Sequence, residues 1–147
     1  MKTYDQLVAE AAEHIIELMP WDLEQKLDNN TPLLLIDVRE PEEFNVMHIA
    51  NAINIPRGIL EAASEIGYDE TNLELANARD KFVLVICRSG KRSCMAAYTL
   101  KQLGFEHAAS LKTGLRGWND YDQPLIDEQN QLVDADYAEE ILRPQAS

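Results

Sequence analysis

Apolar residues in the first part of the chain recur at three- and four-residue steps, the spacing of an amphipathic helix. They lie between residues 4 and 19, and Pro20 marks a stop because proline ends or kinks a helix. The residues that share this spacing are Tyr4, Leu7, Val8, Ala11, Ile15, Leu18 and Met19. We therefore predict that residues 1–19 form an N-terminal amphipathic helix that extends the main domain.

Further along, short apolar runs alternate with helical patterns. The runs cover residues 33–36, 52–55, 82–86 and 108–111, and the helical patterns cover 22–27, 41–46, about 93–103, 115–121 and 135–142. Wholly apolar runs are typical of strands that are buried on both faces of a parallel sheet. Their alternation with helices implies βαβ units. The pattern predicts an α/β fold with a mainly parallel sheet flanked by helices on both faces.

Length and charge narrow the class of protein. With 147 residues, of which 46% are hydrophobic, the chain can bury one core, and we assign it to residues 20–125. Residues 126–147 form an acidic tail with a short helix. The net charge of −13 argues against nucleic acid or an anionic membrane as partner. The sequence shows no signal-peptide pattern and has two cysteines. We therefore expect a protein of the reducing cytoplasm with free thiols.

The most informative stretch is residues 87–93, Cys-Arg-Ser-Gly-Lys-Arg-Ser, which we call the cysteine loop. It follows the predicted strand 82–86, and open parallel sheets place their sites at the C-terminal ends of strands. Backbone N–H groups, the start of a helix and three cations all favour thiolate, the reactive form of Cys87. Arg88 and Arg92 are expected to bind an anionic substrate. Lys91 either joins them or is an ordinary surface charge.

The small residues of the cysteine loop have predicted roles around the sulfur. Ser89 and Ser93 are expected to cap the following helix or to supply N–H and hydroxyl donors. Gly90 lacks a Cβ and can therefore turn its N–H inward. Cys94 falls in the first helical turn and is expected to be a packing residue, not a redox partner of Cys87.

A second polar cluster follows the run 33–36. Asp37 and Arg39 are assigned a structural role in fixing the loop after this strand, and Arg39 and Glu43 are candidates for a pair across one helical turn. His48 is expected to be a hydrogen-bonded structural histidine, and Trp118 is expected to pack in the core. The three histidines show no metal-ligand spacing with either cysteine, so no metal is predicted.

Four segments in order, residues 36–44, 48–56, 87–93 and 111–118, resemble the rhodanese homology domain, a family of single-domain sulfurtransferases. The resemblance covers roughly residues 21–124. The chain departs from it at Met47, Asn51 and Thr113, where family members usually carry glycine. These departures lie in turns and packing positions and bear on backbone geometry more than on chemistry.

The resemblance implies a five-stranded sheet and a sulfurtransferase that works through a persulfide on Cys87. Sulfane sulfur would come from thiosulfate or a persulfide donor and go to a thiol or cyanide, with a sulfur-carrier protein as a further candidate partner. The nucleophiles and leaving groups are stable anions, so the reaction needs no cofactor and no dedicated general acid. The protein has to supply N–H donors and positive charge.

Two other functions remain open at this stage. A cysteine-dependent phosphatase or arsenate reductase also grips an oxyanion in a Cys-to-Arg loop, but that loop usually has one residue more than the four between Cys87 and Arg92. It also needs a general acid, and the cysteine loop contains no Asp. The other alternative is a non-catalytic interaction module on the same fold, of which loss of the cysteine is the usual sign.

Overall fold

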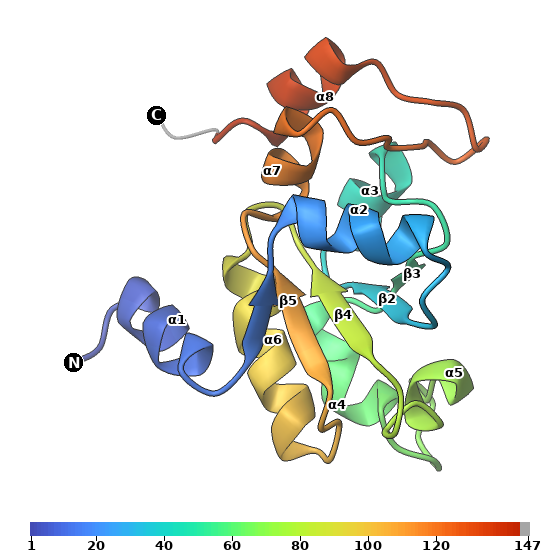
Figure 1. The fold of residues 1–147 in the computed structure, drawn as a ribbon. Coiled ribbons are helices and arrows are strands. Elements are labelled where there is room, and N and C mark those ends of the chain that lie inside the picture. Colours follow the sequence, from blue (N-terminus) through green and yellow to red (C-terminus); the bar gives the residue numbers. More distant parts are fainter. Residues whose placement is uncertain (145–147) are drawn as a thin grey trace.

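The computed structural model describes residues 1–144. Its centre is an all-parallel sheet of five strands in the order β1-β5-β4-β2-β3 (Figure 1). The strands are β1 (Ile16–Leu18), β2 (Leu34–Asp37), β3 (Ile53–Asn54), β4 (Val83–Ile86) and β5 (Ala108–Leu111). This sheet confirms the predicted α/β class and the predicted five strands.

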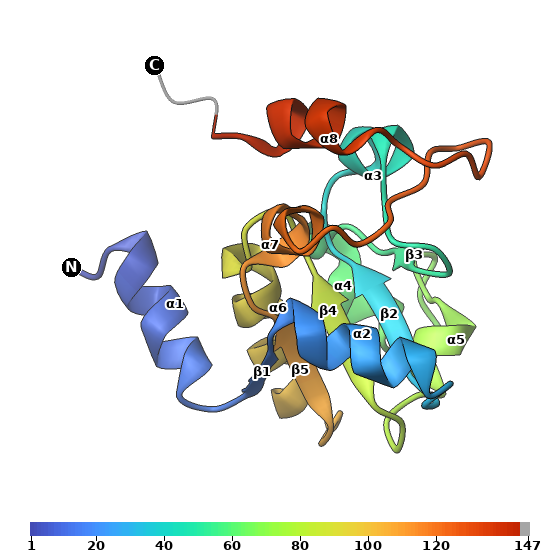
Figure 2. The same ribbon diagram turned by 45° about the horizontal axis from the view of Figure 1, so that its top comes forward.

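Helices cover both faces of the sheet, as the alternating pattern predicted (Figures 1 and 2). They are α1 (Tyr4–Ala12), α2 (Pro20–Asp28), α3 (Pro41–Val46), α4 (Leu60–Ala63), α5 (Leu73–Ala76), α6 (Lys91–Gln102), α7 (Gly114–Asp120) and α8 (Ala135–Leu142), with a 3₁₀ turn η1 (Arg57–Ile59) before α4. No helix within residues 1–144 has the length and apolar character needed to cross a membrane.

The sheet separates two hydrophobic cores because successive side chains of a strand point to opposite faces. In β4, Val83 and Val85 point into the core beneath α4, α5 and α6, while Leu84 and Ile86 point into the core beneath α2, α7 and α8. Every residue of β4 is buried. The strand that leads into Cys87 is therefore held from both sides, which gives the cysteine loop a rigid base.

The N-terminal region differs from the prediction. The helix α1 begins with a capping box between Thr3 and Gln6 but ends at Ala12. The next apolar residues form β1, which pairs in parallel with β5, and the prediction of a helix to residue 19 was therefore wrong beyond residue 12. Pro20 opens α2 at its first turn, where its missing N–H does no harm.

The C-terminal helix α8 has the predicted bounds and packs against α7 (Figure 2). Asp134 caps it by accepting the N–H of Tyr137 at 3.1 Å, and its apolar side places Ala138 and Leu142 in the core. The last three residues of the predicted tail, 145–147, lie outside the described residues. The division of the chain at residues 19 and 125 stays a prediction.

The helix α1 lies along α6 at the edge of the molecule (Figure 1). The Cys94 thiol contacts the Val8 carbonyl at 3.5 Å, and Lys91 pairs with Asp5 at 2.8 Å. Just after α1, His14 adds two contacts to α6: its carbonyl accepts from the Lys101 ammonium at 2.8 Å, and its ring stacks on that of Tyr98 with centroids 4.6 Å apart. Ala11 is the one residue of α1 that is buried. Thus α1 is attached mainly through a narrow strip.

Two of the residues that stand where family members usually carry glycine adopt the left-handed backbone conformation that glycine favours. Asn51 has φ 70° and Thr113 has φ 68°. For a β-branched residue this region is strained by about 1–2 kcal/mol. We predict that Thr113→Gly raises the free energy of unfolding by about 1 kcal/mol, or Tm by about 2–4 °C. Asn51→Gly is the matched control and should change stability less, because asparagine tolerates this region. A lower Tm for Thr113→Gly in thermal denaturation would contradict the prediction.

Candidate active site

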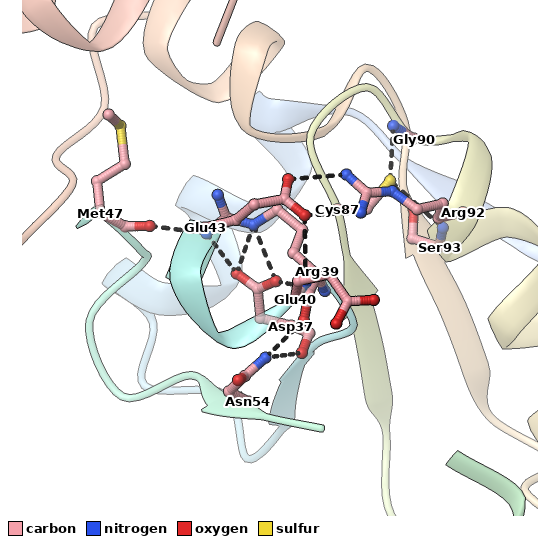
Figure 3. A network of polar contacts seen from close by, with 10 residues as sticks. All are labelled: Asp37, Arg39, Glu40, Glu43, Met47, Asn54, Cys87, Gly90, Arg92 and Ser93. Carbon is pink, nitrogen blue, oxygen red and sulfur yellow. Dashed lines mark hydrogen bonds and ion pairs between the residues drawn. The ribbon is translucent and has the colours of Figure 1, made fainter. Parts of the chain in front are cut away.

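Cys87 directly follows β4, and its side chain is 1% exposed. Its sulfur accepts the backbone N–H groups of Gly90 at 3.1 Å and Ser93 at 3.3 Å (Figure 3). The Ser93 hydroxyl lies 3.4 Å from the sulfur and is held at 2.7 Å by the hydroxyl of Ser110 on β5. The cysteine loop thus places two backbone N–H groups and one hydroxyl around a single sulfur atom.

The shape of the cysteine loop depends on two glycines. One lies within the loop, and the other lies in the segment that packs against it. Gly90 has φ 94°, which turns its N–H towards the sulfur. A Cβ on Gly114, at the start of α7, would lie 2.5 Å from the carbonyl oxygen of Arg88. The backbone between β4 and α6 therefore packs directly on the turn between β5 and α7, and neither glycine can be replaced without moving that backbone.

The helix after the cysteine loop begins at Lys91, two residues earlier than predicted. Its N-cap is Gly90, without a side-chain capping hydrogen bond, so neither Ser89 nor Ser93 acts as the cap. Both polar groups of Ser93 face the sulfur: its N–H donates to the Cys87 sulfur, and its hydroxyl oxygen accepts from the Cys87 thiol. Ser89 is half-buried and lines a shallow hollow beside α7.

The three cations of the cysteine loop differ in their partners. Arg92 donates two hydrogen bonds, at 2.9 and 3.0 Å, to the carboxylate of Glu43 on α3. Lys91 forms an exposed ion pair at 2.8 Å with Asp5 on α1. The Arg88 side chain is half-buried and has no hydrogen-bond or ion-pair partner within residues 1–144. Arg88 is therefore the loop cation whose charge is not matched by an acidic partner within residues 1–144.

The pair between Arg92 and Glu43 shifts the pKa values of the two groups in opposite directions, and each shift favours the charged form. Hydrogen bonding to Arg92 lowers the pKa of Glu43, although partial burial opposes this. Hydrogen bonding to Glu43 raises the pKa of Arg92, although partial burial opposes this. Both side chains are ionised at neutral pH, so a carboxylate lies at the margin of the candidate site.

The Asp37 and Arg39 side chains form a buried ion pair at 2.9 Å at the end of β2 (Figure 3). Arg39 also donates to the carbonyl of Met47 at 2.7 Å, and Asn54 donates to the carbonyls of Asp37 and Arg39. The predicted pair between Arg39 and Glu43 was wrong. Arg39 forms its ion pair with Asp37, and Glu43 forms its ion pair with Arg92. The network fixes the start of α3, on which Glu43 lies.

The remaining side chains lie where the sequence suggested. Cys94 is buried with a free thiol, and burial raises its pKa to about 11, with Glu17 and Cys87 adding to the effect. His48 contacts the Phe44 carbonyl through Nδ1 at 2.8 Å. Trp118 is buried and donates its indole N–H to the Pro124 carbonyl at 3.0 Å.

Sequence reasoning missed three residues that shape the site: Glu43, Ser110 and Gly114. Ser110 had a usable signal, since it is the polar residue in the otherwise apolar run 108–111. Gly114 is one of the few glycines and follows a strand. Glu43 had no comparable signal, because its partner Arg92 is 49 positions away in the chain.

Fold and site together define an α/β protein with a buried cysteine at the C-terminal end of a central parallel strand, its sulfur held by the first turn of the next helix. Such a site can stabilise a thiolate and any sulfur attached to it. Residues 19–121 match the model of the family described as "Rhodanese-like domain". The chain belongs to this family.

Named relatives agree with this membership. The chain is 36% identical over 111 residues to "Putative sulfur carrier protein YrkF" of Bacillus subtilis, covering 75% of this chain and 54% of that protein. It is 31% identical over 103 residues to "Putative thiosulfate sulfurtransferase, mitochondrial" of Schizosaccharomyces pombe, covering 68% of this chain and 72% of that protein. The chain therefore spans about half the length of the first of these relatives.

Among solved structures, the fold is similar to that of a protein from Rhodopseudomonas palustris described as of unknown function and a "Possible Tyrosine Phosphatase". The TM-score is 0.77 at 23% identity, and the match covers 84% of this chain and 94% of that one. At this identity the likeness concerns the fold alone.

Proposed function

We propose that the protein is a sulfurtransferase that carries sulfane sulfur as a persulfide on Cys87. The observation that carries this proposal is the convergence of two backbone N–H groups on the Cys87 sulfur, at 3.1 and 3.3 Å. Donors fixed in this way stabilise negative charge on sulfur without having to reorganise. Membership of the rhodanese-like family and the sulfur-transfer names of the relatives support the same function.

The reaction consists of two displacements at sulfur. The Cys87 thiolate attacks the outer sulfur of thiosulfate, the S–S bond of thiosulfate breaks, and sulfite leaves with the bonding electron pair. Cys87 then carries a persulfide anion. An acceptor thiolate or cyanide attacks the terminal sulfur and takes it, which restores the Cys87 thiolate and gives an acceptor persulfide or thiocyanate. No net oxidant, reductant or cofactor is needed.

The neighbouring residues have separate proposed roles. Gly90 and Ser93 hold the anionic sulfur through their N–H groups, and Arg88 binds the anionic donor because its guanidinium has no partner within residues 1–144. Arg92, Lys91 and Ser89 shape the approach. Candidate partners are a small anionic sulfur donor, a thiol or cyanide acceptor and a sulfur-carrier protein. A reducing compartment such as the cytoplasm suits a thiol that has to stay free.

The experiment that tests this function is intact-mass measurement after treatment with a sulfur donor, compared with hydrolysis of phenyl phosphate by the same protein. We expect the mass to increase by one sulfur on Cys87, cyanide to remove that sulfur as thiocyanate, and phenyl phosphate to remain intact. Turnover of phenyl phosphate without a persulfide would favour the phosphatase alternative. Partner binding without a persulfide would favour the interaction module.

A further inference from the structure

We propose that Glu43 is a specificity residue: by neutralising Arg92, it shifts the preference of the site away from the thiosulfate dianion and towards persulfide donors of lower negative charge. This inference rests on the proposed function and names the substrate class of the same site. It concerns a residue outside the cysteine loop, since Glu43 lies on α3.

Glu43 and Arg92 form a well-oriented ion pair. Both oxygens of Glu43 accept hydrogen bonds from Arg92, at 2.9 and 3.0 Å, in the two-pronged arrangement that fixes a guanidinium most firmly. In Figure 3 Arg92 lies between Glu43 and the sulfur of Cys87. The side chains of both members of the pair are 34% exposed, so solvent screens their charges only in part.

The ion pairs reduce the positive charge that remains around the sulfur. Arg92 is matched by Glu43 and Lys91 by Asp5, which leaves Arg88 as the loop cation without an acidic partner within residues 1–144. The chain as a whole carries a large negative excess, with a net charge of −13. A donor therefore meets roughly one uncompensated positive charge, far fewer than the sequence of the loop suggests.

By Coulomb's law, the charge of Glu43 affects donors of different charge to different extents. The interaction energy scales with the product of the charges, so a carboxylate at the margin repels a dianion twice as strongly as it repels a monoanion. Thiosulfate is a dianion at neutral pH. Cysteine persulfide carries at most one net negative charge, because its ammonium and carboxylate groups balance each other. Glu43 should therefore weaken the binding of thiosulfate more than that of the persulfide, compared with a site in which Arg92 is unpaired.

Both donors can load the same cysteine. With a persulfide, the Cys87 thiolate attacks the terminal sulfur of RSSH, the S–S bond of the donor breaks, and RS⁻ leaves while Cys87 becomes Cys–SSH. With thiosulfate, the same attack releases sulfite. The chemistry at Cys87 is alike in the two cases, and the charge of the leaving group is what differs.

The test compares loading of Cys87 by the two donors in the wild type and in Glu43→Gln, followed by intact mass at limiting donor concentration. Glutamine keeps the size of the side chain and an oxygen for Arg92 but removes the charge. We expect the kcat/KM ratio of thiosulfate to cysteine persulfide to rise by about three- to tenfold, the effect of one unit charge across roughly a Debye length. Added salt should shrink this rise.

Three further variants separate charge from geometry. Glu43→Asp keeps the charge but shortens the reach, so its ratio should stay near that of the wild type. Asp5→Asn frees the exposed Lys91 and should raise the ratio by a smaller factor. Glu42→Gln is the matched control, because Glu42 is an exposed neighbour on α3 without a partner within residues 1–144, and its ratio should change less than twofold.

The outcomes distinguish this inference from the proposed function. If neither donor loads Cys87, the proposed function fails. If both donors load it and Glu43→Gln changes both rates equally, or Glu43→Asp changes the ratio as much as Glu43→Gln does, then Glu43 has only a structural role. In that case the inference is overturned while the sulfurtransferase assignment stands.

Discussion

Replacing Cys87 by serine is expected to lower thiocyanate formation by about a thousandfold or more and to abolish the persulfide. The reason is the position of the sulfur, which is the atom to which Gly90 and Ser93 donate their N–H groups. A serine hydroxyl is not ionised at neutral pH and cannot carry sulfane sulfur. The measurement is steady-state thiocyanate production, together with intact mass after donor treatment.

Cys94→Ser provides the control for this prediction. Burial raises the pKa of the Cys94 thiol to about 11, so it stays protonated at neutral pH and is a poor nucleophile. Its contact with the Val8 carbonyl can be kept by a serine hydroxyl. We expect Cys94→Ser to retain most of the activity. Reversed results for the two variants would falsify the assignment of Cys87 as the sulfur carrier.

The second large effect concerns stability. Arg39→Met is expected to lower the free energy of unfolding by about 3–5 kcal/mol, because it leaves the fully buried carboxylate of Asp37 without a countercharge. The carbonyl of Met47 also loses its donor. For a chain of this length Tm should fall by roughly 10 °C. Thermal and urea denaturation would measure both quantities.

Two comparisons identify the cause of that loss. Lys2→Ala breaks the exposed pair with Glu10, in which the side chains are 60% and 50% exposed, and should change stability by about 1 kcal/mol or less. Adding Asp37→Asn to Arg39→Met removes the unpaired charge and should recover part of the stability. If the double variant is less stable than Arg39→Met alone, an unpaired charge is not the cause.

The sequence predicted much of this fold because most elements are set by local patterns. Pro41 opens a helix at the predicted residue, and β5 and α8 have the predicted bounds. The error at β1 has a non-local cause. Ile15 and Leu18 fit a helical spacing, but Ile16 and Leu18 pair with Ala109 and Leu111 near the other end of the domain. Such distant pairing overrides a local helical preference.

The candidate site shows the same division between local and distant causes. The cysteine loop is contiguous in sequence, so the placement of Gly90 and Ser93 around the sulfur could be predicted. The partner of Arg92 could not, since the i,i+4 spacing suggested that Glu43 would pair with Arg39. Arg39 pairs with Asp37 and not with Glu43 because Asp37 is buried, and a buried carboxylate needs a countercharge more than an exposed one does.

The attachment of α1 through a narrow strip has a consequence for the dynamics of the molecule. An element with little buried apolar surface opens locally at a small fraction of the global unfolding free energy. When α1 lifts, the thiol of Cys94 loses the Val8 carbonyl that covers it and becomes accessible to solvent. The rate at which a thiol reagent modifies Cys94 in the folded protein therefore reports how often this helix detaches beside the cysteine loop.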